Sequence, residues 1–206
     1  IEKIPDYQEF LDNIETSGKY LSEILNSVID ISEIERGNLS YQETDINIIK
    51  FFKNIFYVHK VGALKKHIYL KYTKIGKTVP QIIRSDRAKL EKILNVIIDN
   101  ALKFTAPEKT VHIKLATQNN RLIFEIEDEG IGISSKHLET IFEPFEKILK
   151  NRVQGYSGIG LGLSVAHSMV KLLNGHITVK SKINQGSTFI IDIPLIESIL
   201  KSKNEK

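Results

Sequence analysis

The hydrophobic periodicity of the chain changes near residue 40, and this change constrains the fold class. Residues 6–36 predict one long helix, because apolar residues recur there at spacings of three, four and seven. From residue 40 onward, short strand patterns alternate with helical patterns. Strands in antiparallel pairs with helices to one side are typical of an α+β protein. The sequence therefore predicts a two-layer α/β sandwich preceded by a long helix.

The predicted helix at residues 6–36 is acidic around its apolar stripe. Residues 1–36 hold nine acidic and three basic residues, whereas the whole chain has a net charge of +4. A single amphipathic helix cannot bury its own stripe. It needs a hairpin partner, a second subunit or the body of the domain, and near-heptad spacing suits a helical bundle. The stripe consists of Leu11, Ile14, Leu21, Ile24, Leu25, Val28 and Ile31.

After residue 40, the sequence pattern predicts helices at 46–59, 87–104 and 161–173, with a short one near 135–141. Strands are predicted at 39–46, 68–72, 81–84, 111–115, 122–126, 177–179 and 189–193. Asp86 offers an N-cap for the 87–104 helix, and Asn119-Asn120 suits a hairpin turn between two strands.

The composition excludes several classes of protein. Hydrophobic residues make up 41% and charged residues 26%, which is typical of globular proteins and not of disordered ones. The chain has no cysteine, which excludes disulfides, thiolate metal sites and cysteine catalysis. No apolar stretch reaches membrane-helix length, and no signal peptide opens the chain. The basic body favours anionic ligands such as nucleotide phosphates. No Lys/Arg run is dense enough to predict a nucleic-acid partner.

Two segments suggest ligand chemistry. Asn100 lies near the end of the 87–104 helix among apolar residues, where its amide oxygen could join the octahedral shell of Mg²⁺. A hydrogen-bonded structural role is the alternative. The segment 128–133, Asp-Glu-Gly-Ile-Gly-Ile, follows a predicted strand, and its glycines let the backbone approach a flat ligand. Asp128 could accept a hydrogen bond from an exocyclic amine such as adenine N6; a tight turn with a solvated carboxylate is the alternative.

A third segment, Gly158-Ile159-Gly160-Leu161-Gly162-Leu163-Ser164, opens the 161–173 helix. Free N–H groups and the positive dipole end at a helix N-terminus favour phosphate. The G-x-G-x-G spacing is not a Rossmann fingerprint. It is not a Walker P-loop either, because Lys71 stands where the first glycine before Gly76-Lys77-Thr78 should be. Signatures of eukaryotic-type protein kinases are absent as well.

The order of these segments is more specific than any one of them. Asn100, then D-x-G-x-G, then Phe142-Glu143-Pro144-Phe145, then a loop and G-x-G-x-G, resembles the ATP-binding domain of sensor histidine kinases. The superfamily is shared with gyrase, Hsp90 and MutL. The four segments match its N, G1, F and G2 boxes. The 186–189 segment resembles the closing Gly-x-Thr turn, and residues 17–39 resemble the second helix of the dimerisation hairpin.

The resemblance implies a Bergerat-type ATP-binding fold with an ATP·Mg²⁺ site beneath a mobile lid, here residues 146–157. It implies that Asp128 reads the adenine, Asn100 holds Mg²⁺, Lys103 faces phosphate and Thr188 helps to floor the adenine pocket. The complete implied set is Asn100, Lys103, Asp128, Gly130, Gly132, Ile133, Phe142, Phe145, Gly158, Gly160, Leu161, Gly162 and Thr188.

The remaining roles in this set are also implied by the resemblance. The backbone of Gly158, Gly160 and Gly162 would wrap the phosphates. Phe142 and Phe145 would anchor the lid, with ordinary core packing as the alternative for both.

The resemblance also implies an organisation and partners. Residues 1–38 would be part of a dimerisation hairpin, 39–196 the ATP-binding catalytic domain and 197–206 a tail. The protein would form a homodimer through its N-terminal helical region and signal to a response regulator receiver domain. A cytoplasmic location is expected, compatible with a membrane anchor elsewhere in the parent protein.

The implied activity is transfer of the γ-phosphoryl group from ATP·Mg²⁺ to a histidine, with no catalytic residue assigned in this chain. In the family the acceptor histidine is followed by an acid, and none of the six histidines here is. All are therefore interpreted as structural or surface residues. The acceptor is expected upstream of Ile1, unless the natural protein lacks one. The six are His59, His67, His112, His137, His167 and His176.

Val96 is a second departure from the family. It lies four residues before Asn100 on the same helix face, where gyrase-type hydrolases carry a glutamate. Valine cannot act as a general base, which argues against a mechanical ATPase of that type. Asn95 points about 100° away around the helix, and Glu91 lies further off and is not an obvious substitute. A nucleotide-binding dimerisation adaptor without phosphotransfer is the alternative to a kinase.

Overall fold

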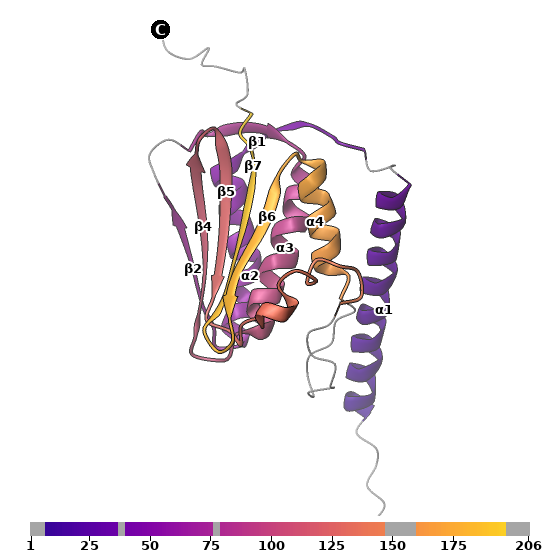
Figure 1. The fold of residues 1–206 in the computed structure, drawn as a ribbon. Coiled ribbons are helices and arrows are strands. Elements are labelled where there is room, and N and C mark those ends of the chain that lie inside the picture. Colours follow the sequence, from indigo (N-terminus) through magenta and orange to yellow (C-terminus); the bar gives the residue numbers. More distant parts are fainter. Residues whose placement is uncertain (1–6, 37–39, 76–78, 147–159, 197–206) are drawn as a thin grey trace, which may run out of the picture. The chain divides into compact units, whose positions relative to one another are not determined.

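The computed structural model describes residues 7–36, 40–75, 79–146 and 160–196 (Figure 1). The chain forms two compact units, Ile1–Leu39 and Ser40–Lys206, which are described separately.

The first unit contains one helix, α1 (Tyr7–Glu35), which confirms the helix predicted at 6–36. Side chains of its apolar stripe remain exposed, with Leu11, Ile14, Leu21 and Leu25 at 55–57%. Among the described residues, no helix is long and apolar enough to cross a bilayer.

The second unit is built on a five-stranded sheet with the order β2-β4-β5-β7-β6. Its strands are β2 (Tyr69–Lys74), β4 (Thr110–Gln118), β5 (Arg121–Asp128), β6 (His176–Lys182) and β7 (Gly186–Pro194). All neighbours pair antiparallel except β2 and β4, which are parallel. The expectation of antiparallel pairs was therefore wrong at this edge, because the chain returns through a strand and a helix before it re-enters the sheet.

Three helices cover one face of the sheet (Figure 1): α2 (Ile48–Lys65), α3 (Arg87–Phe104) and α4 (Gly162–Leu172). A separate ribbon pairs β1 (Thr44–Asn47) with β3 (Ile82–Ser85). Several predicted boundaries were wrong. The strand expected at 39–46 begins only at Thr44, because the N–H of Gln42 donates to the Asp86 carboxylate and not to a neighbouring strand. The helix expected at 46–59 begins after its N-cap Asn47, which accepts from the N–H of Lys50, and runs on to Lys65. The short helix expected at 135–141 is a 3₁₀ turn, η1 (Ser135–His137).

The core lies between the sheet and the helices. Alternate apolar residues of β4, β5 and β7 face the helices and are at most 5% exposed, among them Val111, Phe124 and Ile191. The opposite face is polar, and there Lys114 bridges Glu125 and Glu127 at 2.7 Å each. This division confirms the predicted two-layer α/β sandwich.

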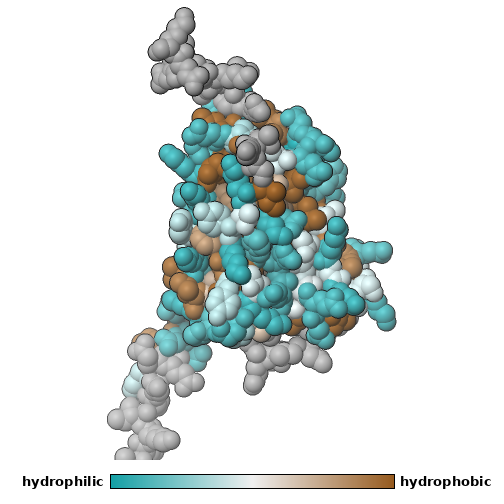
Figure 2. All heavy atoms as spheres, turned by 90° about the vertical axis from the view of Figure 1, so that its left-hand side faces the viewer, coloured by the Kyte–Doolittle hydropathy of each residue, from teal (hydrophilic) through white to brown (hydrophobic). Residues whose placement is uncertain are grey.

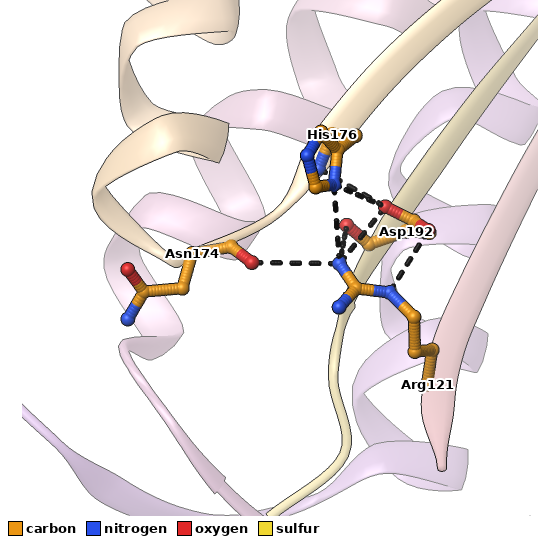
Figure 3. Close-up of polar contacts among 4 residues, drawn as sticks. All are labelled: Arg121, Asn174, His176 and Asp192. Atoms are coloured by element: carbon orange, nitrogen blue, oxygen red, sulfur yellow. Dashed lines mark hydrogen bonds and ion pairs between the residues drawn. The ribbon is translucent and has the colours of Figure 1, made fainter. Parts of the chain in front are cut away.

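A polar cluster joins three strands at the end of the sheet where β5 begins (Figure 3). The guanidinium of Arg121 contacts both carboxylate oxygens of Asp192, at 2.9 and 3.0 Å. It also donates to the carbonyl of Asn174 at 3.4 Å, and Asp192 accepts the N–H of His176 at 3.0 Å. The hydrogen bonds of Arg121 hold the pKa of Asp192 below its usual range, although burial alone would raise it. The cluster ties β5, β6 and β7 together at the end opposite Asp128.

Candidate nucleotide-binding site

Helix α3 positions the N-box residues. Asp86 caps it by accepting from the N–H of Lys89 at 3.1 Å, and its buried side is apolar. Asn100 lies half-buried near the last turn, as does Lys103, whose ammonium stands 5.2 Å from the centroid of the Phe104 ring. The sequence thus placed both residues correctly on one end of the helix.

The other polar residues of this helix segment face α2. The buried His59 bonds Asn95 through Nε2 at 2.9 Å and Asp99 through Nδ1 at 3.2 Å. Burial lowers the pKa of His59, but the hydrogen bonds to Asp99 and Asn95 outweigh it, and the pKa is raised overall. Asn95 is therefore hydrogen-bonded to α2, on the side of α3 away from Asn100.

Val96 faces the start of α4. A β-carbon added to Gly162 would stand 3.3 Å from Cγ1 of Val96. The residue one turn before Asn100 therefore contacts the G2 box directly. The position where related hydrolases carry a glutamate is filled here by an apolar side chain.

Asp128 ends β5 on the helix side of the sheet and is only 7% exposed. Its Oδ1 accepts the N–H of Gly130 at 2.8 Å. Burial raises the pKa of Asp128, while hydrogen bonds from the backbone of Gly130 and Ser187 lower it less. Across the ranges that the structure describes, no cation pairs with this carboxylate. A buried acceptor without a cation suits a neutral donor such as an exocyclic amine.

The G1 loop lies on the end of α3. The N–H of Ile131 donates to the carbonyl of Phe104 at 3.2 Å, and a β-carbon on Gly130 would stand 2.6 Å from that same oxygen. Only glycine allows this approach. The contact brings Asp128 and the Asn100 end of α3 to the same corner of the sandwich.

The F box meets the G2 box. The N–H of Phe145 donates to the carbonyl of Gly160 at 3.0 Å, and Gly160 has a φ of +82°, a conformation that favours glycine. Phe142 is half-buried and lies against His167 of α4, with ring centroids 5.0 Å apart. Phe145 is 66% exposed, so it is not a core residue. Gly158 and lid residues 147–157 lie outside the described residues, and anchoring of the lid stays a prediction.

Within the part of the chain that the structure describes, the start of α4 has no side-chain cap. Leu161 is buried and occupies the N-cap position without a capping hydrogen bond, and the first turn has no acidic residue. The first N–H groups of a helix have no partner within the helix. Together with the dipole, these groups favour an anion such as phosphate.

One implied residue is misplaced. Thr188 lies in register with Glu127 and Lys180 on the open face of the sheet, whereas Asp128 faces the helices. Thr188 therefore cannot floor a pocket on the Asp128 side. Strand alternation places its neighbour Ser187, which pairs with Asp128 and is 7% exposed, on that side instead.

Sequence reasoning missed a serine pair that holds the G1 loop. Ser181 Oγ lies 2.9 Å from Ser187 Oγ and accepts the N–H of Ile133 at 2.7 Å. Ile133 is buried beside it. Phe189, Ile191 and Ile193 alternate in the strand predicted at 189–193, so the period of two already indicated Ser187 as an inward residue.

The donor set fits ATP with Mg²⁺. The buried Asp128 offers an acceptor for the base, and the uncapped start of α4 offers donors for phosphate. Among the described residues, no group of three or more His, Cys, Asp or Glu side chains could hold a metal by itself. Mg²⁺ keeps waters and phosphate oxygens and needs few protein ligands, so the amide oxygen of Asn100 would suffice.

This fold and site define a nucleotide-binding domain of the Bergerat type. A family model for the histidine kinase-, DNA gyrase B- and HSP90-like ATPases matches residues 85–197. The chain belongs to that family, and it contains an ATP-binding catalytic domain of the histidine kinase type.

Curated relatives extend the match over nearly the whole chain. Hybrid signal transduction histidine kinase B of Dictyostelium discoideum is 33% identical over 91% of this chain, which spans 10% of that relative. The circadian input-output histidine kinase CikA of Synechococcus elongatus is 31% identical over 93% of this chain and 26% of its own length. The chain therefore spans a small part of the relatives it matches.

Solved structures share the fold. Full-length ShkA in complex with AMPPNP has a TM-score of 0.81 at 21% identity, over 96% of this chain and 41% of ShkA. Histidine kinase ThkA in complex with the response regulator protein TrrA has a TM-score of 0.71 at 19% identity, over 97% of this chain and 54% of ThkA.

Proposed function

We propose that this chain is the catalytic part of a sensor histidine kinase, which binds ATP·Mg²⁺ and transfers the γ-phosphoryl group to a histidine. The observation that carries the proposal is the corner where three elements converge. These are the buried carboxylate of Asp128, the Asn100 end of α3 and the uncapped start of α4. The curated relatives that match nearly the whole chain are histidine kinases by name, which supports the same activity.

The chain's own residues would bind and orient the nucleotide. Asp128 would accept the exocyclic amine of adenine, and Gly130 lets the loop approach the base. The first N–H groups of α4, near Gly160 and Gly162, would hold the phosphates. Such positioning supplies most of the catalysis in phosphoryl transfer, since the protein does little covalent chemistry.

Magnesium would be held by Asn100 together with the phosphates. When bound, a divalent cation neutralises charge on the phosphoryl oxygens. The half-buried Lys103 lies one turn further along α3, where it would face the same phosphates. No general base is assigned, because Val96 cannot take a proton.

The partners follow from the same proposal. A homodimer would form through the helical region that includes α1, whose exposed apolar stripe needs cover. Phosphoryl transfer would continue to a response regulator receiver domain, and the kinase would be a phosphoprotein while its acceptor histidine carries phosphate. The structure of histidine kinase ThkA in complex with the response regulator protein TrrA supports this kind of partner. We place this part of the protein in the cytoplasm, where ATP is available.

The nucleotide half of the proposal is tested by calorimetric titration of the chain with a non-hydrolysable ATP analogue, with and without Mg²⁺. Saturable binding is expected, tightened by Mg²⁺. Asp128→Asn should weaken it at least ten-fold, because hydrogen bonds to charged groups contribute about 1.5–3 kcal/mol. Glu139→Gln, at an exposed position, is the matched control and should bind like the wild type. Absence of binding by the wild type would overturn the proposal.

The phosphoryl-transfer activity is tested on the complete protein as the cell translates it, incubated with γ-labelled ATP and Mg²⁺. Acid-labile label on a histidine is expected, and it should pass to a receiver domain added afterwards. Label absent despite normal nucleotide binding would overturn the kinase activity while leaving the nucleotide site intact.

A further inference from the structure

The positive charge of this chain is concentrated in one stretch of sequence. Residues 46–85 contain eight lysines and one arginine and no aspartate or glutamate. The net charge of the whole chain is only +4, so this stretch is far more basic than the rest. It comprises α2, the edge strand β2 and most of the β1–β3 ribbon.

The exposed side of α2 adds apolar side chains to this charge. Tyr57, Val58, Val61 and Leu64 are 56–67% exposed, although the opposite side of the same helix is buried in the core. Their spacings of three and four residues place them on one side of the helix. We call these four residues, with the exposed Lys53, Lys60 and Lys65, the α2 surface. Figure 2 faces the β2 edge and shows hydrophobic side chains scattered among hydrophilic ones.

Over the described ranges, none of the lysines of this stretch forms an ion pair with an aspartate or glutamate, unlike Lys89 and Lys114 elsewhere in the chain. Lys60 lies 5.6 Å from the centroid of the Phe56 ring, and Lys66 donates to a backbone carbonyl. The charge of the α2 surface is therefore available to an anionic partner.

We propose that the α2 surface docks on an anionic lipid bilayer. Protein surfaces mix both signs of charge, whereas a headgroup layer is uniformly anionic and repels any carboxylate. A stretch of forty residues without an aspartate or glutamate therefore fits a headgroup layer better than a protein surface. Exposed aliphatic side chains favour lipid over nucleic acid, which binds through aromatic stacking and hydrogen bonds. This inference does not depend on the kinase activity.

The test is sedimentation of the chain with vesicles of phosphatidylcholine alone, or of phosphatidylcholine mixed with phosphatidylglycerol, at about 0.1 M salt. Binding is expected only to the mixed vesicles. Lys53→Gln/Lys60→Gln/Lys65→Gln should weaken it about a hundred-fold, since each lysine near an anionic surface contributes about five-fold. Val58→Gln/Val61→Gln/Leu64→Gln should also weaken binding, because the apolar centre enters the interface.

A matched control distinguishes the effect of the α2 surface on vesicle binding from the effect of net charge alone. Lys136→Gln/Lys171→Gln/Lys180→Gln removes the same charge from exposed positions elsewhere and should bind like the wild type. All four proteins should melt as folded domains and bind nucleotide alike. Equal losses in the two lysine variants would overturn the proposal, as would unchanged binding by the apolar variant. Binding to duplex DNA or to an acidic peptide without vesicle binding would also overturn it.

Discussion

Gly162 lies against Val96, so that a β-carbon on Gly162 would stand 3.3 Å from Cγ1 of Val96. This contact joins the start of α4, where we propose that phosphates bind, to the turn of α3 before Asn100. Because the contact is apolar on the α3 side, it positions α4 without supplying a proton acceptor. Val96 thus acts here through packing.

The Gly162–Val96 contact predicts that substitutions at these two positions change the free energy of unfolding non-additively. Gly→Ala in a helix gains about 0.5–1 kcal/mol, but at Gly162 the new methyl would press on Val96. We expect Gly162→Ala to gain little in the wild type and about 0.5–1 kcal/mol in a Val96→Ala background. Urea unfolding of the four proteins measures this coupling. Gly62→Ala in α2, where an added β-carbon would meet no atom of another part of the chain within 4 Å, is the control and should gain the full amount. Additive effects at 162 and 96 would contradict the contact.

The serine pair predicts which residue of β7 supports the nucleotide site. Ser181→Ala and Ser187→Ala should each weaken binding of an ATP analogue about five-fold, the equivalent of a typical hydrogen bond of ~1 kcal/mol. The reason is that Ser181 accepts the N–H of Ile133 and Ser187 bonds Ser181. Thr188→Ala, on the open face, should change affinity less than about two-fold. Titration calorimetry decides, and a larger effect at Thr188 would show that the strand is turned the other way.

Asp86 joins the segment before β1 to the N-terminus of α3, and its loss should destabilise the body. The carboxylate accepts N–H groups of Gln42 at 2.9 Å and Lys89 at 3.1 Å, and its Oδ2 lies 2.8 Å from the Lys89 ammonium. Asp86→Ala should lower the free energy of unfolding by about 2 kcal/mol at neutral pH. Asp45→Ala, at a more exposed position whose pairing with Arg84 is 3.8 Å long, is the control and should cost less than about 0.5 kcal/mol.

The Asp86 effect should also depend on pH. Burial would raise the pKa of Asp86, but the hydrogen bonds from Lys89 and Gln42 outweigh it and lower the pKa overall. A lowered pKa in the folded state means that the contribution is present above the unfolded pKa of about 3.9 and is lost as the pH falls through the folded value. The free energies of unfolding of the wild type and of Asp86→Ala should therefore converge in acid. A difference in the free energy of unfolding that stays constant down to pH ~2 would show that the ionised carboxylate is not its cause.

The Arg121–Asp192 pair should stabilise the sheet without affecting nucleotide binding. The pair is partly exposed, so Asp192→Asn should cost only about 1 kcal/mol at neutral pH. Since the pKa of Asp192 is lowered, that cost should shrink as the pH falls through the folded pKa. Affinity for an ATP analogue should stay within about two-fold, because Asp192 lies at the opposite end of the sheet from Asp128. A large loss of affinity would mean that the two ends are coupled.

Much of this protein was predictable from short-range pattern. The helix at 6–36, the hairpin around Asn119-Asn120 and the inward residues of β4, β5 and β7 follow from periods of 3.6 and two, and all are present. That the segments around Asn100, Asp128 and the G2 glycines meet was implied by the resemblance to a known family, and not by the local pattern. The same alternation also indicates that Ser187 faces inward.

Only the tertiary structure decided the features that depend on distant segments. The parallel pairing of β2 with β4, the capture of Asn95 and Asp99 by His59, and the contact of Gly162 with Val96 each join residues far apart in the sequence. Local periodicity says which face of an element is buried, but not which element covers it, since many partners could bury the same stripe. That choice is made by packing and register across the whole fold.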